Sequence, residues 1–302
     1  MHPAASIIVF TTLSGLGYGL AAMLGFGLLD PAAITTKIAH VLALALISAG
    51  LLSSTLHLGN PQRAWRAFSQ WRSSWLSREG VLAVLGLPVL TFNAAASIFR
   101  DAYVPATGIL AVLFCIVTVC CTAMIYASLR SVQAWNTRLT PACFLAFSLS
   151  GGALLALLFT GVPATWPALA TVVMLALAWG LKWSWWNRVD TLTALSTPES
   201  ATGLGDIGRV RLFERPHMNG NYLTREMGHS VARKHARKLR IIAVLAGGVA
   251  PAALVVLSLL VGGWPAVVLT GLACASHLLG VVTERWLFFA EARHAVMNYY
   301  GA

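Results

Sequence analysis

The stretch STLHLGNPQRAWRAFSQWRSSWLSREG, residues 54–80, joins two apolar segments that are each long enough to cross a bilayer. A histidine, His57, lies at the end of the first segment, and a glutamate, Glu79, lies at the start of the second. The stretch therefore predicts a membrane protein that places two proton-carrying side chains at one membrane face, beneath basic and aromatic residues. These intervening residues are Arg63, Trp65, Arg66, Trp71, Arg72, Trp75 and Arg78.

The composition excludes a soluble enzyme. Of the 302 residues, 58% are hydrophobic and 10% are charged, whereas about 25% of the residues in soluble domains are charged. A mean hydropathy of +0.74 indicates a protein with several membrane spans. All five cysteines fall inside apolar segments and none has C-x-x-C spacing, so we expect no metal site and no iron–sulfur cluster in this chain.

Eight apolar segments predict an all-α integral membrane protein, a single domain over residues 1–302. About 20 helical residues cross a hydrocarbon core of about 30 Å. No strand-like alternation of barrel length occurs, which favours a helical bundle. Residues 182–240 form a long basic loop between the sixth and seventh spans. The expected spans are residues 5–29, 38–58, 80–99, 107–128, 140–161, 165–181, 241–262 and 264–283.

The distribution of Lys and Arg predicts the orientation in the membrane. Nineteen of the 21 fall on the side that holds both termini and the loops after the second, fourth and sixth spans. Only Lys37 and Arg100 fall on the other side. Because basic loops remain in the cytoplasm, we expect both termini, His57 and Glu79 on the cytoplasmic side of a bacterial inner membrane. The net charge of +11 is thus a topology signal and does not indicate nucleic-acid binding.

Ionisable side chains in the spans are functional candidates because charge is costly in a membrane. A quinone ring has two polar oxygens and takes up two protons with two electrons, so its site needs a histidine and a carboxylate that titrate near the working pH. We therefore predict a quinone site in which His57 and Glu79 transfer protons. Further predicted binding residues are Arg63, Trp65, Arg66, His277, Glu284 and Arg285. The last three have an open alternative, which is to hold the eighth span to its neighbours.

Two other functions compete with a quinone site. A haem held by two histidines is disfavoured, because His40 and His57 lie about a membrane thickness apart on one span and His277 lacks an obvious opposite partner. A secondary transporter for a small anion is the alternative from another class. It is disfavoured because no internal repeat is evident and because the charged residues gather at the inner edge of the spans.

The basic loop has two interpretations. Residues 224–240, TREMGHSVARKHARKLR, have helical periodicity and strong positive charge, and residues 209–223 alternate weakly as a hairpin would. A basic helix fits a surface of anionic lipid as well as it fits a docking platform for a soluble partner. The candidate docking residues are Arg209, Arg211, Arg225, Arg233, Lys234, Arg237 and Lys238.

The opening stretch resembles the dimethyl sulfoxide reductase anchor-subunit family. His57-Leu58-Gly59-Asn60-Pro61 matches H-L-G-x-P, and Leu76-Ser77-Arg78-Glu79 matches L-S-x-E. The resemblance implies an eight-helix, haem-free subunit that anchors a molybdopterin catalytic subunit and a four-cluster iron–sulfur subunit, with His57 and Glu79 in its quinol site. Arg78 directly before the glutamate departs from the better-known reductase pattern, and a neighbouring arginine would favour ionised Glu79.

Three further segments resemble the branch of this family found in sulfite-oxidising complexes. They are residues 199–204 (ESATGL), 221–228 (NYLTREMG) and 284–294 (ERWLFFAEARH). That branch implies soluble subunits on the cytoplasmic side and electron flow from sulfite to ubiquinone or menaquinone. The expected role is the quinone-reactive subunit of such an oxidoreductase, without molybdenum of its own. The alternative within the family is a quinol-oxidising anchor of the dimethyl sulfoxide reductase type.

Overall fold

The computed structural model describes residues 4–56, 60–161, 164–193, 197–214 and 231–300. This part of the chain contains no strand, and eight of its helices are long and apolar enough to cross a membrane, which confirms the expected all-α bundle. The spans are α1 (Ala5–Gly25), α2 (Ile34–Thr55), α3 (Trp75–Arg100), α4 (Pro105–Ala127), α5 (Leu139–Phe159), α6 (Thr165–Asp190), a seventh span (His235–Val261) and α10 (Gly263–Ala290).

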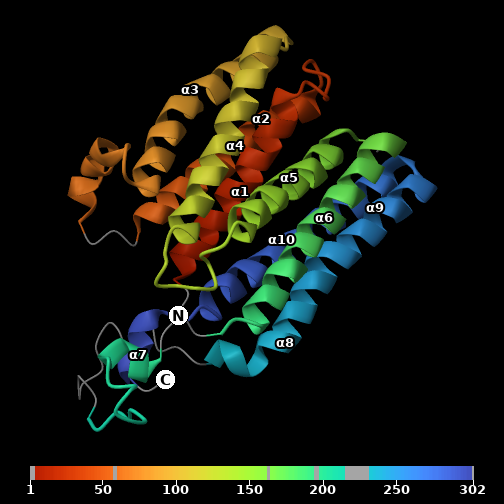
Figure 1. Cartoon of the computed structure of the whole chain (residues 1–302). Helices are drawn as coiled ribbons and strands as arrows, with labels where there is room; N and C mark the ends of the chain where they lie inside the picture. The colour runs from red at the N-terminus through yellow and green to blue at the C-terminus, as the bar shows by residue number, and fades with distance from the viewer. Residues whose placement is uncertain (1–3, 57–59, 162–163, 194–196, 215–230, 301–302) are drawn as a thin grey trace.

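The spans run side by side and alternate in direction (Figure 1). Helices α1 to α4 form one half of the bundle, α5, α6, α9 (Ala250–Val261) and α10 form the other, and α1 packs directly on α5. Helix α1 begins and α10 ends at the same end, which also carries α7 (Pro198–Thr202). We refer to this as the loop end. Its position on the cytoplasmic side remains a prediction from the charge distribution.

Small residues let α1 and α5 approach closely at the centre of the bundle. A Cβ at Gly19 would lie 1.8 Å from the carbonyl oxygen of Ser148, and a Cβ at Gly152 would lie 2.1 Å from the carbonyl carbon of Gly19. The Ser148 hydroxyl donates to the carbonyl oxygen of Gly15 over 2.7 Å. Close contact between backbones through small residues is the usual way in which helices associate inside a membrane.

Replacing Gly19 with alanine should destabilise the protein by about 1–3 kcal/mol, because the new methyl group would displace the α5 backbone. Gly180→Ala is the matched control, since a Cβ at this helical glycine meets nothing within 4 Å. The melting temperatures of both variants in detergent measure the effect. Equal melting temperatures would contradict the close approach of α1 and α5.

The seventh span is interrupted by a π-helical turn. This turn, η3 (Leu245–Val249), separates α8 (Val231–Val244) from α9. A Cβ at Gly280 of α10 would lie 2.2 Å from the Cα of Gly247, so the span and α10 touch through their glycines at this turn. In a π turn the hydrogen-bond register of the helix shifts, and such turns are frequent at functional sites.

Some boundaries differ from those expected from hydropathy. Helix α6 continues to Asp190, beyond the expected end at residue 181, so Lys182 belongs to a membrane-spanning helix and not to the basic loop. Helix α1 ends at Gly25 rather than near residue 29, because a turn with Gly27 at φ 68° follows. The hairpin expected over residues 209–223 lies largely outside the described residues, and residues 209–214 form no strand.

Candidate functional site

Glu79 lies inside the bundle near the loop end, on the second turn of α3. Its side chain is 4% exposed, and its carboxylate accepts a hydrogen bond from the hydroxyl of Thr122 on α4. In the described part of the chain Glu79 forms no ion pair. Because an unpaired charge is costly in a buried site, a carboxyl group in this position is suited to exchange protons.

Arg78 is not the charge partner of Glu79. Its Nε donates to the carbonyl oxygen of Trp71 over 2.9 Å, and its Nη2 donates to that of Arg72 over 2.6 Å. Its guanidinium also lies 4.2 Å from the centre of the Trp75 ring. Arg78 thus binds the backbone of the turn before α3. Because adjacent residues of a helix point in different directions, its side chain does not face Glu79. The sequence-based expectation that Arg78 favours ionised Glu79 has no geometric support.

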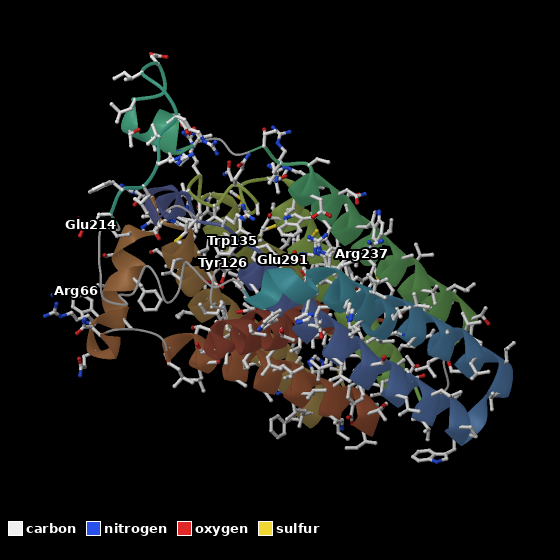
Figure 2. The ribbon with its side chains drawn as sticks, turned by 90° about the horizontal axis from the view of Figure 1, so that it is seen from below. Arg66, Tyr126, Trp135, Glu214, Arg237 and Glu291 are labelled. Atoms are coloured by element: carbon white, nitrogen blue, oxygen red, sulfur yellow. The ribbon has the colours of Figure 1, made fainter. Side chains whose placement is uncertain are left out.

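The predicted interfacial residues lie on η1 (Pro61–Gln70), a 3-10 helix beside the start of α3. Arg63, Trp65 and Arg66 are exposed, and the Arg66 guanidinium stacks 5.6 Å from the centre of the Trp65 ring. Figure 2 shows Arg66 at the outer edge of the molecule. The structure therefore separates these three side chains from buried Glu79. His57 lies outside the described residues, so its pairing with Glu79 stays a prediction.

A second polar centre, the ion cluster, consists of Lys182 on α6 and Glu284 and Arg285 on α10. Each of these residues is at most 2% exposed. The Lys182 Nζ lies 2.6 Å from one Glu284 carboxylate oxygen, and the Arg285 Nε lies 3.3 Å from the other. Aromatic rings pack against both cations. The centre of the Trp185 ring lies 3.7 Å from the Lys182 Nζ, and the centre of the Phe144 ring lies 3.7 Å from the Arg285 guanidinium. The ion cluster contains two cations and one anion.

His277 does not join Glu79 in the structure. It is 2% exposed on α10, and its Nδ1 lies 2.6 Å from the carbonyl oxygen of Gly247 in the π turn. Of the two roles considered for this histidine, the geometry supports a link between α10 and the seventh span. The hydrogen bond joins these helices at the glycine contact between Gly247 and Gly280.

A small cavity lies between Glu79 and the ion cluster. It is lined by residues of α1, α4, α5 and α10, and its volume is about 20 Å³. Thr122, the hydrogen-bond partner of Glu79, lines the cavity together with Arg285 of the ion cluster. The space is sufficient for a water molecule, but it is far below the roughly 300–1,000 Å³ of pockets that bind organic ligands.

Two residues of these polar centres, Lys182 of the ion cluster and Thr122 beside Glu79, are not singled out in the sequence analysis. Hydropathy places Lys182 in the basic loop, although this lysine interrupts an apolar and tryptophan-rich run, WGLKWSWW, at residues 179–186. A lone lysine in such a run is a signal for a buried ion pair. Thr122 carries no comparable signal, because a threonine in an apolar helix most often bonds to its own backbone.

At the loop end, an arginine ties three helices together. Arg240 of α8 donates to Asp190 of α6 over 2.6 and 3.0 Å, and to Glu291, directly after α10, over 2.9 and 3.2 Å. This clamp removes Arg240 from the charges that are available to a partner. Among the predicted docking residues, Arg209, Arg211, Arg237 and Lys238 are exposed, and Figure 2 shows Arg237 on the surface of α8. The side chains of Arg225, Arg233 and Lys234 lie outside the described residues.

Comparison with known proteins agrees with this architecture. Residues 1–204 match the family described as DMSO reductase anchor subunit (DmsC). The chain belongs to the DMSO reductase anchor-subunit family. It is also 32% identical over 330 aligned residues to a sulfite dehydrogenase subunit of Allochromatium vinosum, and the alignment covers 99% of each chain. The family resemblance found in the sequence is thereby confirmed.

Proposed function

We propose that this chain is the membrane anchor and quinone-reactive subunit of a sulfite-oxidising complex. The observation that carries the proposal is Glu79, a buried carboxyl group that forms no ion pair with the described residues and that Thr122 holds near the loop end of the bundle. Such a group can give a proton to a reacting oxygen and regain it from the adjacent aqueous side. The similarity to the sulfite dehydrogenase subunit of Allochromatium vinosum supports sulfite as the electron source.

The proposed reaction divides between the proteins of the complex. Sulfite and water give sulfate, two electrons and two protons at a molybdopterin protein, and an iron–sulfur protein carries the electrons to the membrane. The described residues of this chain contain no group of three or more His, Cys, Asp or Glu side chains that could hold a metal ion. Ubiquinone or menaquinone takes up both electrons and two protons. Glu79 and His57 supply these protons in the proposal.

The quinone ring would bind at the surface of the bundle. Three cavities among the described residues have volumes of about 10–20 Å³, so none of these three can hold a ring. The membrane face of η1 and the start of α3 is the favoured position, because Phe68 of η1 packs beside Gly80, where a Cβ would lie 3.2 Å from the ring. Exposed Trp65 and Arg66 on the same segment can contact the quinone ring and its oxygens.

The soluble partners would dock at the loop end. The exposed basic residues Arg209, Arg211, Arg237 and Lys238 lie there and can pair with acidic residues of the iron–sulfur protein. The excess of Lys and Arg on this side supports a cytoplasmic location. A four-cluster iron–sulfur protein as the direct partner, with the molybdopterin protein beyond it, completes the proposed complex.

Purification of the tagged chain from its own membranes in mild detergent tests this function. We expect two soluble proteins with molybdenum and iron to copurify, and we expect sulfite to reduce a short-chain ubiquinone, a menaquinone analogue or both. Sulfite oxidation that proceeds with ferricyanide but with neither quinone would contradict the quinone site. If the complex oxidises quinol with reduction of dimethyl sulfoxide and does not respond to sulfite, the result would support the reductase alternative.

A further inference from the structure

The buried charges of the bundle balance only when both polar centres are counted together. Within the described spans, the buried charged side chains are Glu79, Lys182, Glu284 and Arg285. The ion cluster alone carries one excess positive charge. An uncompensated charge is unfavourable in a low-dielectric interior. The four side chains are neutral as a set when the Glu79 carboxyl group is ionised.

Two residues that line the cavity between the two centres carry a buried polar atom without a hydrogen-bond partner. Arg285 Nη1 and Thr12 Oγ1 have no hydrogen-bond partner among the described residues, and the two residues are only 2% and 1% exposed. Thr12 and Arg285 both line the cavity of about 20 Å³, together with Thr122. A polar cavity of more than roughly 10–15 Å³ with two to four polar partners is suited to an ordered water molecule.

We propose that ordered water fills this cavity and connects Arg285 to Glu79, so that Arg285 is the charge partner of the proton-transferring carboxylate. Arg285 Nη1 donates to the water, the water donates to Thr122 Oγ1, and the Thr122 hydroxyl donates to Glu79. Every donor in this series of hydrogen bonds points toward Glu79. The Glu79 carboxylate is therefore the final acceptor of the series.

The role of Arg285 as a positioning residue in proton transfer rests on the proposed quinone function, whereas its contact with Glu79 through water does not. Among the described residues, the other titratable groups within electrostatic reach of Glu79 are Tyr18 on α1 and Cys121 and Tyr126 on α4. His57, the proposed partner of Glu79 in proton transfer, lies outside the described residues. Tyrosine and cysteine side chains are neutral at pH 7 unless their environment favours the anion. Arg78 on α3 is turned to the carbonyl groups before the helix.

A high-resolution structure of the intact complex tests the water directly. We expect density for water within hydrogen-bond distance of Arg285 Nη1. Gly15→Ala should remove this density, because Gly15 lines the cavity and a Cβ there meets nothing within 4 Å. Gly180→Ala, an equally unhindered glycine on α6 that does not line the cavity, should retain it. A dry cavity in the unaltered protein, or an anion other than Glu79 at Arg285 Nη1, would overturn the proposal.

An infrared titration of Glu79 in the same complex tests the coupling. The carboxyl band is assigned by its loss in Glu79→Gln. Arg285→Gln leaves the Lys182–Glu284 pair intact, and it should raise the titration midpoint of Glu79 by about one pH unit or more. Arg285→Lys, which keeps the charge, should restore part of the shift.

An unchanged midpoint in Arg285→Gln would refute the coupling. The titration requires no quinone turnover, so its failure is distinct from a failure of the quinone proposal. If the midpoint shifts while sulfite reduces no quinone, the water-linked pair stands and the proposed function does not.

Discussion

Replacing Glu284 with glutamine should destabilise the protein by about 3–5 kcal/mol, the usual cost of removing one partner from a buried ion pair. The expected loss is large because Lys182 and Arg285, each at most 2% exposed, would then remain as two buried cations that have lost the anion between them. The free energy of unfolding in detergent, obtained from denaturant titration of the purified complex or of the chain, measures the effect.

Two control substitutions separate charge balance from the loss of a contact. Lys182→Met leaves Glu284 paired with Arg285, so it should cost less than Glu284→Gln. Asp190→Asn removes one carboxylate from Arg240. Because the Asp190 side chain is 56% exposed, this change should lower the free energy of unfolding by less than about 1 kcal/mol. The charge argument is contradicted if Lys182→Met destabilises the protein as much as Glu284→Gln does.

Replacing Glu79 with glutamine should lower sulfite-dependent quinone reduction by about 10²–10⁴-fold, the usual contribution of a general acid or base. The amide oxygen of glutamine can still accept the Thr122 hydrogen bond, and Lys182 and Arg285 keep Glu284 as their direct anion. The loss of stability should therefore be smaller than in Glu284→Gln, and the complex should still assemble. Comparing the rate with a quinone analogue and the rate with ferricyanide, which takes electrons from the soluble proteins, isolates the step at the membrane.

The matched control for Glu79 is Glu214→Gln, which alters an exposed carboxylate at the loop end (Figure 2). This variant should keep both rates within about twofold of the unaltered complex, because surface substitutions away from a site change little. A Glu79→Gln complex that reduces quinone at the normal rate would show that another group delivers the protons. Loss of both rates would instead indicate failed assembly, which gel filtration of the complex would reveal.

The sequence predicts the bundle well, because a membrane helix must bury its backbone polar groups internally and must be apolar over its whole length. The count of eight spans follows from that constraint. The choice of Glu79 as a candidate residue also follows from the sequence, since a carboxylate at the edge of a span is rarely incidental. The family is likewise evident from the residues around His57 and Glu79.

The remainder of the site depends on contacts that no local pattern records. The sequence places the end of α6 too early, because hydropathy falls at Lys182, and hydropathy alone does not show that Glu284 of α10 neutralises it. The link between Thr122 and Glu79 joins residues on two different spans. The outward position of Arg66 depends on how η1 lies against α3, which sequence spacing does not determine.

The π turn of the seventh span also bears on how this chain can change by insertion and deletion. A π turn contains one residue more than the α-helical turn that it replaces. Deleting one residue within Leu245–Val249 would restore a regular helix and rotate all of α9 by about 100° around its axis. Val255 and Ser258, both at most 1% exposed, would then turn away from the bundle toward lipid. Single-residue gaps at this turn should therefore be rare among relatives, unless the apolar pattern of α9 is shifted with them.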